Sequence, residues 1–413
     1  MNLIKTSMLS GVATVIRIAT GLLVTKIVAF VAGPAGVALI GQLQNIVNLL
    51  MLFAGDFLKT AITKFTAQYH DDSGKTNEIW SASLFIICSL NILWFIAVFT
   101  FSEQIANYFL SDSGYGYLFK IFSISLPFYI LNSFLMSVLN GRRLIKQFIL
   151  LNICTSIISL LLVALFSYFG GMKWTLISYV TNQSIVFFIT FYIIRKEQWC
   201  VLKNFKSKVK VEALTKLMSF ALITFTSILV SNSSLMFIRT HLIETLSDVD
   251  AGNWQAMWSL SQVALSLITT SLSTYLLPQL SSNLESNAVK REIYAALRLI
   301  LPLTIMISAG IYLLKDFIIL ILYTNAFMAM KVLFLPQLIG CCIKVCGWLF
   351  GYVLVAKGLV KLIVISEVIF AISWCVLTIL LTPEFGVIGA AYAFVINSLL
   401  HTVTMFLIFK FKV

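Results

Sequence analysis

Long apolar segments separated by short polar connections recur along the whole chain. Each segment has the length of roughly 20 residues that a helix needs to cross the hydrocarbon core of a bilayer. The pattern therefore predicts an all-α polytopic membrane protein. The twelve expected spans are residues 6–31, 36–64, 79–101, 118–139, 147–168, 173–194, 214–238, 254–277, 294–314, 332–355, 362–381 and 386–409.

Composition and charge distribution support this prediction. Hydrophobic residues make up 60% of the chain and charged residues 11%, against about 25% charged in an average soluble domain. The formal net charge is +13, and Lys and Arg gather at the two ends and in the even-numbered connections. The positive-inside rule then predicts that both termini are cytoplasmic. Because the basic residues form no single exposed domain, we expect membrane lipids and no nucleic acid as partners.

The two halves of the sequence resemble each other. A shift of about 215 residues places Gly171 on Gly386 and Asn182 on Asn397. Six helices in each half give both copies the same orientation, as in parallel repeats related by a pseudo-twofold axis along the membrane normal. We expect an N-terminal six-helix lobe at 1–200, a cytoplasmic linker at 201–213 and a C-terminal six-helix lobe at 214–413, with a central cavity.

Polar residues inside two of the spans gather on one helix face. The second span carries Gln42, Asn45, Asp56, Thr60 and Thr63, and the eighth carries Ser259, Gln262, Ser266, Thr269 and Ser273. Such a stripe either lines a cavity or forms a hydrogen-bonded seam between helices. Because both stripes extend over most of a helix, a cavity lined by Gln42, Asn45 and Gln262 is the favoured interpretation.

Ionisable side chains in or near the spans are costly in lipid, so we expect them to face a cavity or one another. Cations predominate, which favours an anionic substrate. The predicted cavity cations are Lys26, Arg17, Lys64, Arg239 and Lys344. Further candidates for cavity or coupling groups are Asp56, Glu367 and His401.

Several of these residues have an alternative interpretation. Lys64 and Arg239 also suit a position at the membrane rim, and His401 suits a neutral core histidine. Asp56 and Lys59 are three residues apart, a spacing at which opposite charges on a helix neutralise each other. Arg17 and Lys26 lie on opposite sides of an ideal helix, so Lys26 is favoured for the cavity and Arg17 for pairing with an acid such as Asp56.

Motifs for catalysis are not evident in the sequence. It shows no Walker loop, nucleophile elbow or HExxH motif, and its seven cysteines form no CxxC pair. We therefore expect no enzyme activity, no metal and no cofactor. The remaining function classes are a secondary transporter, a channel and a lipid scramblase. The sequence does not decide whether transport is coupled to H⁺ or Na⁺.

Several separated motifs resemble one family over nearly the full chain. They are "GLLVTKIVAFVAGPAGVALIGQLQNI", "TKFTAQYHDD", "STYLLPQLS" at 273–281, "FGYVLVAK" at 350–357 and "SEV" at 366–368. These motifs resemble the Wzx flippases of bacterial polysaccharide assembly, in the O-antigen translocase and enterobacterial common antigen branch of the multidrug/oligosaccharidyl-lipid/polysaccharide superfamily. Asp56 departs from this family, in which small or neutral residues are expected there.

The resemblance implies a function in lipopolysaccharide biosynthesis. An undecaprenyl-pyrophosphate-linked O-antigen repeat unit would move from the cytoplasmic to the periplasmic leaflet of the bacterial inner membrane by alternating access. Cavity cations would hold the pyrophosphate, and an O-antigen polymerase and a chain-length regulator would be partners. The alternatives are a common antigen flippase, a cation-coupled drug exporter of the same superfamily and a scaffold for glycan-assembly enzymes.

Overall fold

The computed structural model describes residues 3–271, 276, 280, 286–357 and 359–412. Within these ranges the chain forms helices and short connections without strands, and nine helices are long and apolar enough to cross a membrane. The protein is thus an all-α polytopic membrane protein, as predicted. The longer helices of its first half are α1 (Leu3–Ala54), α2 (Lys59–Gln68), α3 (Ser73–Thr100), α4 (Ser102–Leu110), α5 (Gly116–Gly141), α6 (Ile145–Ile194) and α7 (Val211–Thr245).

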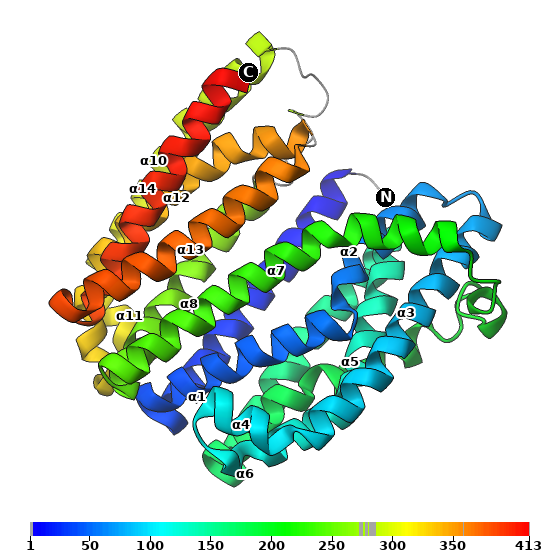
Figure 1. The fold of residues 1–413 in the computed structure, drawn as a ribbon, viewed down its shortest axis with the longest axis horizontal. Helices are drawn as coiled ribbons and strands as arrows, with labels where there is room; N and C mark the ends of the chain where they lie inside the picture. Colours follow the sequence, from blue (N-terminus) through cyan, green and yellow to red (C-terminus); the bar gives the residue numbers. More distant parts are fainter. Residues whose placement is uncertain (1–2, 272–275, 277–279, 281–285, 358, 413) are drawn as a thin grey trace. The chain divides into compact units, whose positions relative to one another are not determined.

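The second half continues the pattern (Figure 1). Its helices are α8 (Asp248–Ser271), α10 (Ser286–Leu313), α11 (Lys315–Leu322), α12 (Lys331–Ala356), α13 (Val360–Phe385) and α14 (Val387–Lys412). The described part of the chain also contains the short 3-10 helices η1 (Asp56–Leu58), η2 (Ser113–Tyr115), η3 (Leu202–Phe205) and η5 (Asn325–Met330). The expected motif at 273–281 and the lower part of the expected stripe, Thr269 and Ser273, lie largely outside the residues whose side chains are described.

The helix α6 contains two of the predicted spans. It is interrupted at Gly171, whose φ of 56° and ψ of −145° are accessible to glycine but not to residues with a Cβ. On either side of this point the Ser167 and Thr175 hydroxyls lie 2.7 Å apart, and Asn182 donates to Ser159 at 3.0 Å. These pairs show an antiparallel hairpin. The helix α1 has a similar interruption at Gly33, with φ of 60°.

Backbone geometry supports the internal repeat independently of sequence identity. Leu144, which precedes α6, has φ and ψ of −79° and 56°, and Leu359, which precedes α13, has −80° and 57°. Gly386, between α13 and α14, has φ and ψ of 61° and −146°, close to those of Gly171. Both pairs are separated by the offset found in the sequence, so the same hairpin was built twice.

The chain divides into two compact units. Unit 1 comprises the chain up to Val31 together with Gln42–Asn232, and unit 2 comprises Ala32–Gly41 together with the chain from Ser233 onward. The sequence places the division at 201–213, whereas the compact units separate within α7. Unit 2 also takes in a segment of α1, because Gly252 of α8 packs so closely on the Pro34 carbonyl that a Cβ there would lie 1.9 Å from its oxygen.

The basic connection before α7 is packed onto unit 1. Trp80 of α3 is 1% exposed, stacks on Phe205 with ring centroids 5.4 Å apart and contacts Trp199 edge-on at 5.9 Å. The Ser207 amide donates to Ser81, and Lys210 pairs with Glu78 at 2.6 Å. The hydrogen bond to Glu78 raises the pKa of Lys210. The connection is therefore an ordered part of unit 1.

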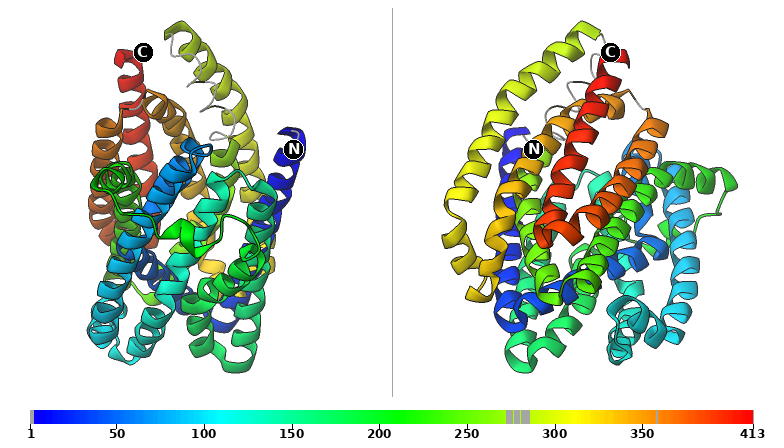
Figure 2. Two further views of the ribbon diagram at one scale, coloured as in Figure 1. Left: turned by 90° about the vertical axis from the view of Figure 1, so that its right-hand side faces the viewer. Right: turned by 60° about the vertical axis from the view of Figure 1, so that its left-hand side comes forward.

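The helices of unit 2 form their own core. Figures 1 and 2 show α12, α13 and α14 lying alongside one another. Trp258 of α8 contacts Trp374 of α13 and Phe394 of α14, with ring centroids 5.0 Å and 5.6 Å apart. Gly340 of α12 faces Phe394 so closely that a Cβ would lie 2.5 Å from its ring. Aromatic burial and this small residue allow the close approach of α12 to α14.

Candidate functional site

A break in the second predicted span positions the candidate site in unit 1. The sequence predicts one continuous helix over 36–64, but α1 ends at Ala54 and the chain continues through η1 into α2. Gly55 has φ of 123°, a conformation that favours glycine. The freed Ala54 carbonyl accepts a hydrogen bond of 2.9 Å from the buried Asn91 amide of α3. Irregular backbone at membrane depth is tolerated only where such partners exist or where it lines a cavity.

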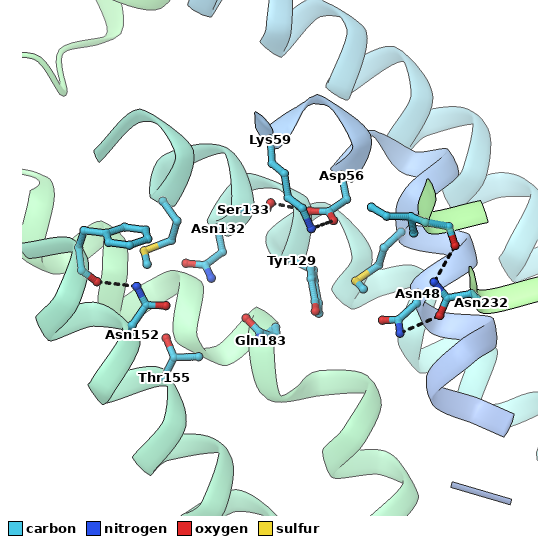
Figure 3. Close-up of a pocket in the computed structure, with 14 residues that line it drawn as sticks. Asn48, Asp56, Lys59, Tyr129, Asn132, Ser133, Asn152, Thr155, Gln183 and Asn232 are labelled. Carbon is cyan, nitrogen blue, oxygen red and sulfur yellow. Dashed lines mark hydrogen bonds and ion pairs between the residues drawn. The ribbon is translucent and has the colours of Figure 1, made fainter. Parts of the chain in front are cut away.

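The break presents a charged pair to a polar cavity. The Asp56 carboxylate accepts from Lys59 at 2.7 Å and from the Ser133 hydroxyl of α5 at 2.6 Å. The Asp56 side chain is 12% exposed and that of Lys59 is 45% exposed. Figure 3 shows Asp56, Lys59 and Ser133 together on one side of the cavity. The mutual neutralisation of Asp56 and Lys59, one of the alternatives from the sequence, is thus the observed geometry.

Two adjoining cavities of about 440 Å³ and 540 Å³ lie within unit 1. They share five lining residues: Asn48, Tyr129, Asn152, Thr155 and Gln183. The first contains Asp56 and Lys59, and the second contains Arg17. Each falls in the size range of sites for small ligands, roughly 300–1,000 Å³. Because the two cavities share these lining residues, which belong to α1, α5 and α6, they form one continuous site. This site is called the unit 1 cavity below.

Amide and hydroxyl side chains dominate the walls of the unit 1 cavity. Asn48 donates to Asn232 at 3.2 Å on one side, and Asn152 and Gln183 lie on another (Figure 3). Asn132 is 5% exposed, and its side-chain oxygen is buried without a hydrogen-bond partner. A buried acceptor left unpaired costs about 1–3 kcal/mol. A ligand hydroxyl that donated to this oxygen would supply the missing hydrogen bond. Amide and hydroxyl side chains replace the water around a sugar in this way.

Charge is distributed unevenly along the unit 1 cavity. The acidic and basic side chains among its lining residues are Arg17, Asp56 and Lys59. Asp56 and Lys59 neutralise each other, whereas within the described residues no ion pair involves Arg17. The end near Arg17 is therefore positive and the end near Asp56 is neutral overall. Arg17 itself is exposed, and an arginine is suited to a phosphate group because its planar fork of donors matches the phosphate oxygens.

The other two predicted cations of unit 1 lie elsewhere. Lys26 is exposed and is not among the residues that line the unit 1 cavity. Lys64 of α2 is exposed, and its ammonium lies 3.9 Å from the centroid of the Phe220 ring. That contact is a cation–π interaction. The structure thus places Arg17, rather than Lys26, in the unit 1 cavity, because the two residues project from different sides of α1.

The predicted cations of unit 2 are packed among aromatic and amide groups. Arg239 of α7 is 1% exposed, donates to Gln255 of α8 and lies 6.0 Å from the Trp254 ring. Lys344 of α12 lies 5.1 Å from the Phe394 ring and 5.8 Å from the Trp374 ring. Both cations are stabilised inside unit 2 by these contacts. Their predicted contact with substrate stays a prediction.

The remaining candidates are also dispersed. Gln42 is buried and donates to the Phe109 carbonyl at 3.4 Å, and Asn45 is 7% exposed. Gln42 matches the alternative of an interhelical seam, whereas the buried side-chain nitrogen of Asn45 has no hydrogen-bond partner among the described residues. Their neighbours Gln44 and Asn48 line the unit 1 cavity. The predicted stripe assumed a continuous helix, so its two ends do not share a face. Three candidates belong to unit 2: Gln262 is exposed, Glu367 is half-buried, and His401 packs edge-on against Phe370 at 4.9 Å.

Sequence reasoning missed most of the polar lining. The cavity residues of α5 and α6 were not among the predicted candidates, although Asn152, Thr155, Ser156 and Ser159 recur at helical spacing on one face. This polar stripe could have been identified from the sequence. Two further lining residues, Asn182 and Gln183, lie in the second half of the α6 hairpin. Residues able to form a metal site, in groups of three or more His, Cys, Asp or Glu, do not occur in the described part of the chain.

A family model described as "Polysaccharide biosynthesis protein" matches residues 3–284. The chain belongs to this polysaccharide biosynthesis protein family. Curated relatives named "Lipid III flippase", from Escherichia coli (strain K12) and Shigella flexneri, are each 27% identical over 401 residues, which is 97% of this chain and 96% of theirs. The similarity to these relatives thus extends along nearly the full chain.

Solved structures place this member of the polysaccharide biosynthesis protein family in a known fold. An inward-facing multidrug resistance MATE family transporter of the MOP superfamily gives a TM-score of 0.82 at 14% identity, covering 97% of this chain and 94% of that one. The lipid II flippase MurJ in an inward closed conformation gives 0.77 at 19% identity, covering 99% and 88%. The two-lobed fold expected from the internal repeat is thus the fold of this superfamily.

Proposed function

We propose that this protein is a flippase for a lipid-linked oligosaccharide, and specifically for an undecaprenyl-pyrophosphate-linked O-antigen repeat unit. The unit would move from the cytoplasmic to the periplasmic leaflet of the inner membrane by alternating access, with both termini cytoplasmic. The unit 1 cavity is the observation that carries this proposal. It combines Arg17, which makes no ion pair within the described residues, with walls of amides and hydroxyls. This combination matches a phosphorylated sugar better than a hydrophobic cation.

The composition of the cavity also separates this proposal from its main rival. A cation-coupled drug exporter needs acidic groups free to bind its cation, but Asp56 is already held by Lys59 and Ser133. The family assignment and the full-length similarity to lipid III flippases support a lipid-linked glycan. Those relatives favour a second candidate substrate, another polyprenyl-linked oligosaccharide such as the common antigen unit.

The proposal is tested by reconstituting the full chain into liposomes that contain a fluorescent polyprenyl-pyrophosphate oligosaccharide in both leaflets. A membrane-impermeant quencher added outside bleaches the outer leaflet at once, and the inner-leaflet signal decays only if the lipid crosses. We expect the protected signal to fall faster with protein than in protein-free liposomes. Equal decay with and without protein, for O-antigen and common antigen units alike, would overturn the proposal.

A further inference from the structure

The two ends of the unit 1 cavity differ in the charge that they can accept. Arg17 brings to one end a positive charge that no acidic side chain among the described residues pairs with. At the other end the Lys59 ammonium is 2.7 Å from Asp56, so the pair has no net charge. A ligand that places phosphate at Arg17 therefore extends its other groups toward a site whose positive charge is already neutralised.

Hydrogen-bonding capacity at the Asp56 end remains available to a neutral ligand. Lys59 has three N–H donors, of which one is directed to Asp56. Asn132, the neighbour of Ser133 on α5, offers a buried side-chain oxygen that has no hydrogen-bond partner among the residues that the structure describes. Donors and an acceptor on the same wall (Figure 3) suit the alternating hydroxyls of an uncharged sugar.

We propose that Asp56, Lys59 and Asn132 form a subsite that selects an uncharged sugar and rejects an acidic one. This inference rests on the proposed function and names the class of sugar that the flippase accepts. A sugar carboxylate brought into this subsite would compete with Asp56 for Lys59 and would face the Asp56 charge at short range. Like charges placed together in a partly dehydrated site disfavour the wrong ligand, which is a general way to obtain specificity.

The test compares two probes in the liposome assay. Both are polyprenyl-pyrophosphate trisaccharides with the same fluorescent group, and they differ only in the terminal sugar, glucose in one and glucuronic acid in the other. For the wild type we expect the glucose probe to cross at least about fivefold faster. Equal rates for the two probes would overturn the subsite while leaving the proposed function intact, whereas no movement of either probe would overturn both.

Two substitutions should change the ratio of the two rates in opposite directions. Asp56→Asn frees Lys59 to bind a carboxylate, so the rate of the acidic probe relative to the neutral one should rise by roughly tenfold. Lys59→Gln leaves Asp56 unpaired, so the same ratio should fall. The ratio is measured within one preparation, so partial loss of folded protein does not affect it. An unchanged ratio in both variants would overturn the inference.

Asp316→Asn is the matched control. Asp316 also pairs with a lysine, Lys331, at 2.8 Å, but it does not line the unit 1 cavity. This variant should retain the wild-type ratio. A shift equal to that of Asp56→Asn would show that the effect is general to the protein's charge and would contradict the subsite. Asn132→Leu should slow both probes by a similar factor, because it removes an acceptor for hydroxyls without changing the charge; no slowing would remove Asn132 from the subsite.

Discussion

The buried Asn91 amide donates a hydrogen bond of 2.9 Å to the carbonyl of Ala54, at the residue where α1 ends. It also donates to Ile87 within its own helix at 2.8 Å. Because Gly55 then turns the chain, Asp56 and Lys59 leave the helix surface and reach the unit 1 cavity. One side chain of α3 thus stabilises the irregular backbone on which the charged pair is built.

Replacing Asn91 with Ala should therefore destabilise the break. The Ala54 carbonyl would lose a partner in a buried position, at a cost of about 1–3 kcal/mol. We expect a lower temperature of thermal unfolding in detergent together with slower lipid translocation. The control is Ser89→Ala, which removes an exposed hydroxyl bonded only within α3. Equal stability of the two variants would contradict the role assigned to Asn91.

Arg17 should bind the anionic part of the substrate. Hydrogen bonds to charged groups contribute about 1.5–3 kcal/mol, so Arg17→Ala should weaken binding of the lipid-linked oligosaccharide by roughly tenfold or more. Arg17→Lys should retain part of the affinity, because it keeps the charge but loses the planar fork. Binding is measured on protein in nanodiscs by native mass spectrometry.

The matched control for Arg17 is Arg195→Ala. Arg195 is exposed and stacks on Tyr192 at 4.1 Å, outside the unit 1 cavity. Its removal should leave the affinity within about twofold of wild type, a free-energy change of about 0.4 kcal/mol. Lys26→Ala, in the same series, measures the contact that the sequence predicts for Lys26. An Arg17→Ala variant that binds as tightly as Arg195→Ala would show that the phosphate lies elsewhere.

The docking of the 195–210 connection onto unit 1 should depend on Trp80. Its ring is buried against Phe205 and Trp199, and its indole N–H donates to Thr66 at 2.9 Å. Trp80→Ala should cost on the order of 3–5 kcal/mol and expose the amides around Ser207 to solvent. Hydrogen exchange followed by mass spectrometry should report faster exchange at 199–208. Unchanged protection there would mean that other contacts hold the connection.

Glycine packing in unit 2 gives a prediction that is independent of the substrate. A Cβ at Gly252 would lie 1.9 Å from the Pro34 carbonyl oxygen, which belongs to backbone and is unable to move aside freely. Gly252→Ala should destabilise the protein by roughly 1–3 kcal/mol or more. Gly310→Ala is the matched control, because no atom lies within 4 Å of its Cβ position. Thermal unfolding that ranks Gly310→Ala below Gly252→Ala would contradict the packing.

The hydrophobic pattern was sufficient to predict the helical fold, because each span is long and bounded by polar connections. Even the hairpin reversal at Gly171 and its copy at Gly386 follow from spacing in the sequence. The break at Gly55 was not predicted, since a single glycine in an apolar run does not reveal its φ. This break separates the face that carries Gln42 and Asn45, which are buried, from the position of Asp56, which lines the unit 1 cavity.

Candidate residues were harder to predict than helices for a further physical reason. The charge of a buried cation is stabilised either by a substrate or by neighbouring aromatic rings and amides. Sequence spacing along one helix does not distinguish these two cases. Lys344 and Arg239 contact such neighbours on other helices. The pairing of Asp56 with Lys59, in contrast, is local in sequence and was readable from their spacing.

The most direct test of the central claim, that the unit 1 cavity holds the substrate headgroup, is site-specific photocrosslinking. A benzophenone amino acid replaces either Gln183, which lines the cavity, or Leu161. Leu161 lies on the same hairpin, is 53% exposed and lines neither part of the cavity. Both variants are irradiated in membranes with a lipid-linked oligosaccharide radiolabelled in its sugars. The account predicts strong labelling at position 183 and little at 161. Equal labelling at the two positions, or stronger labelling at 161, would contradict it.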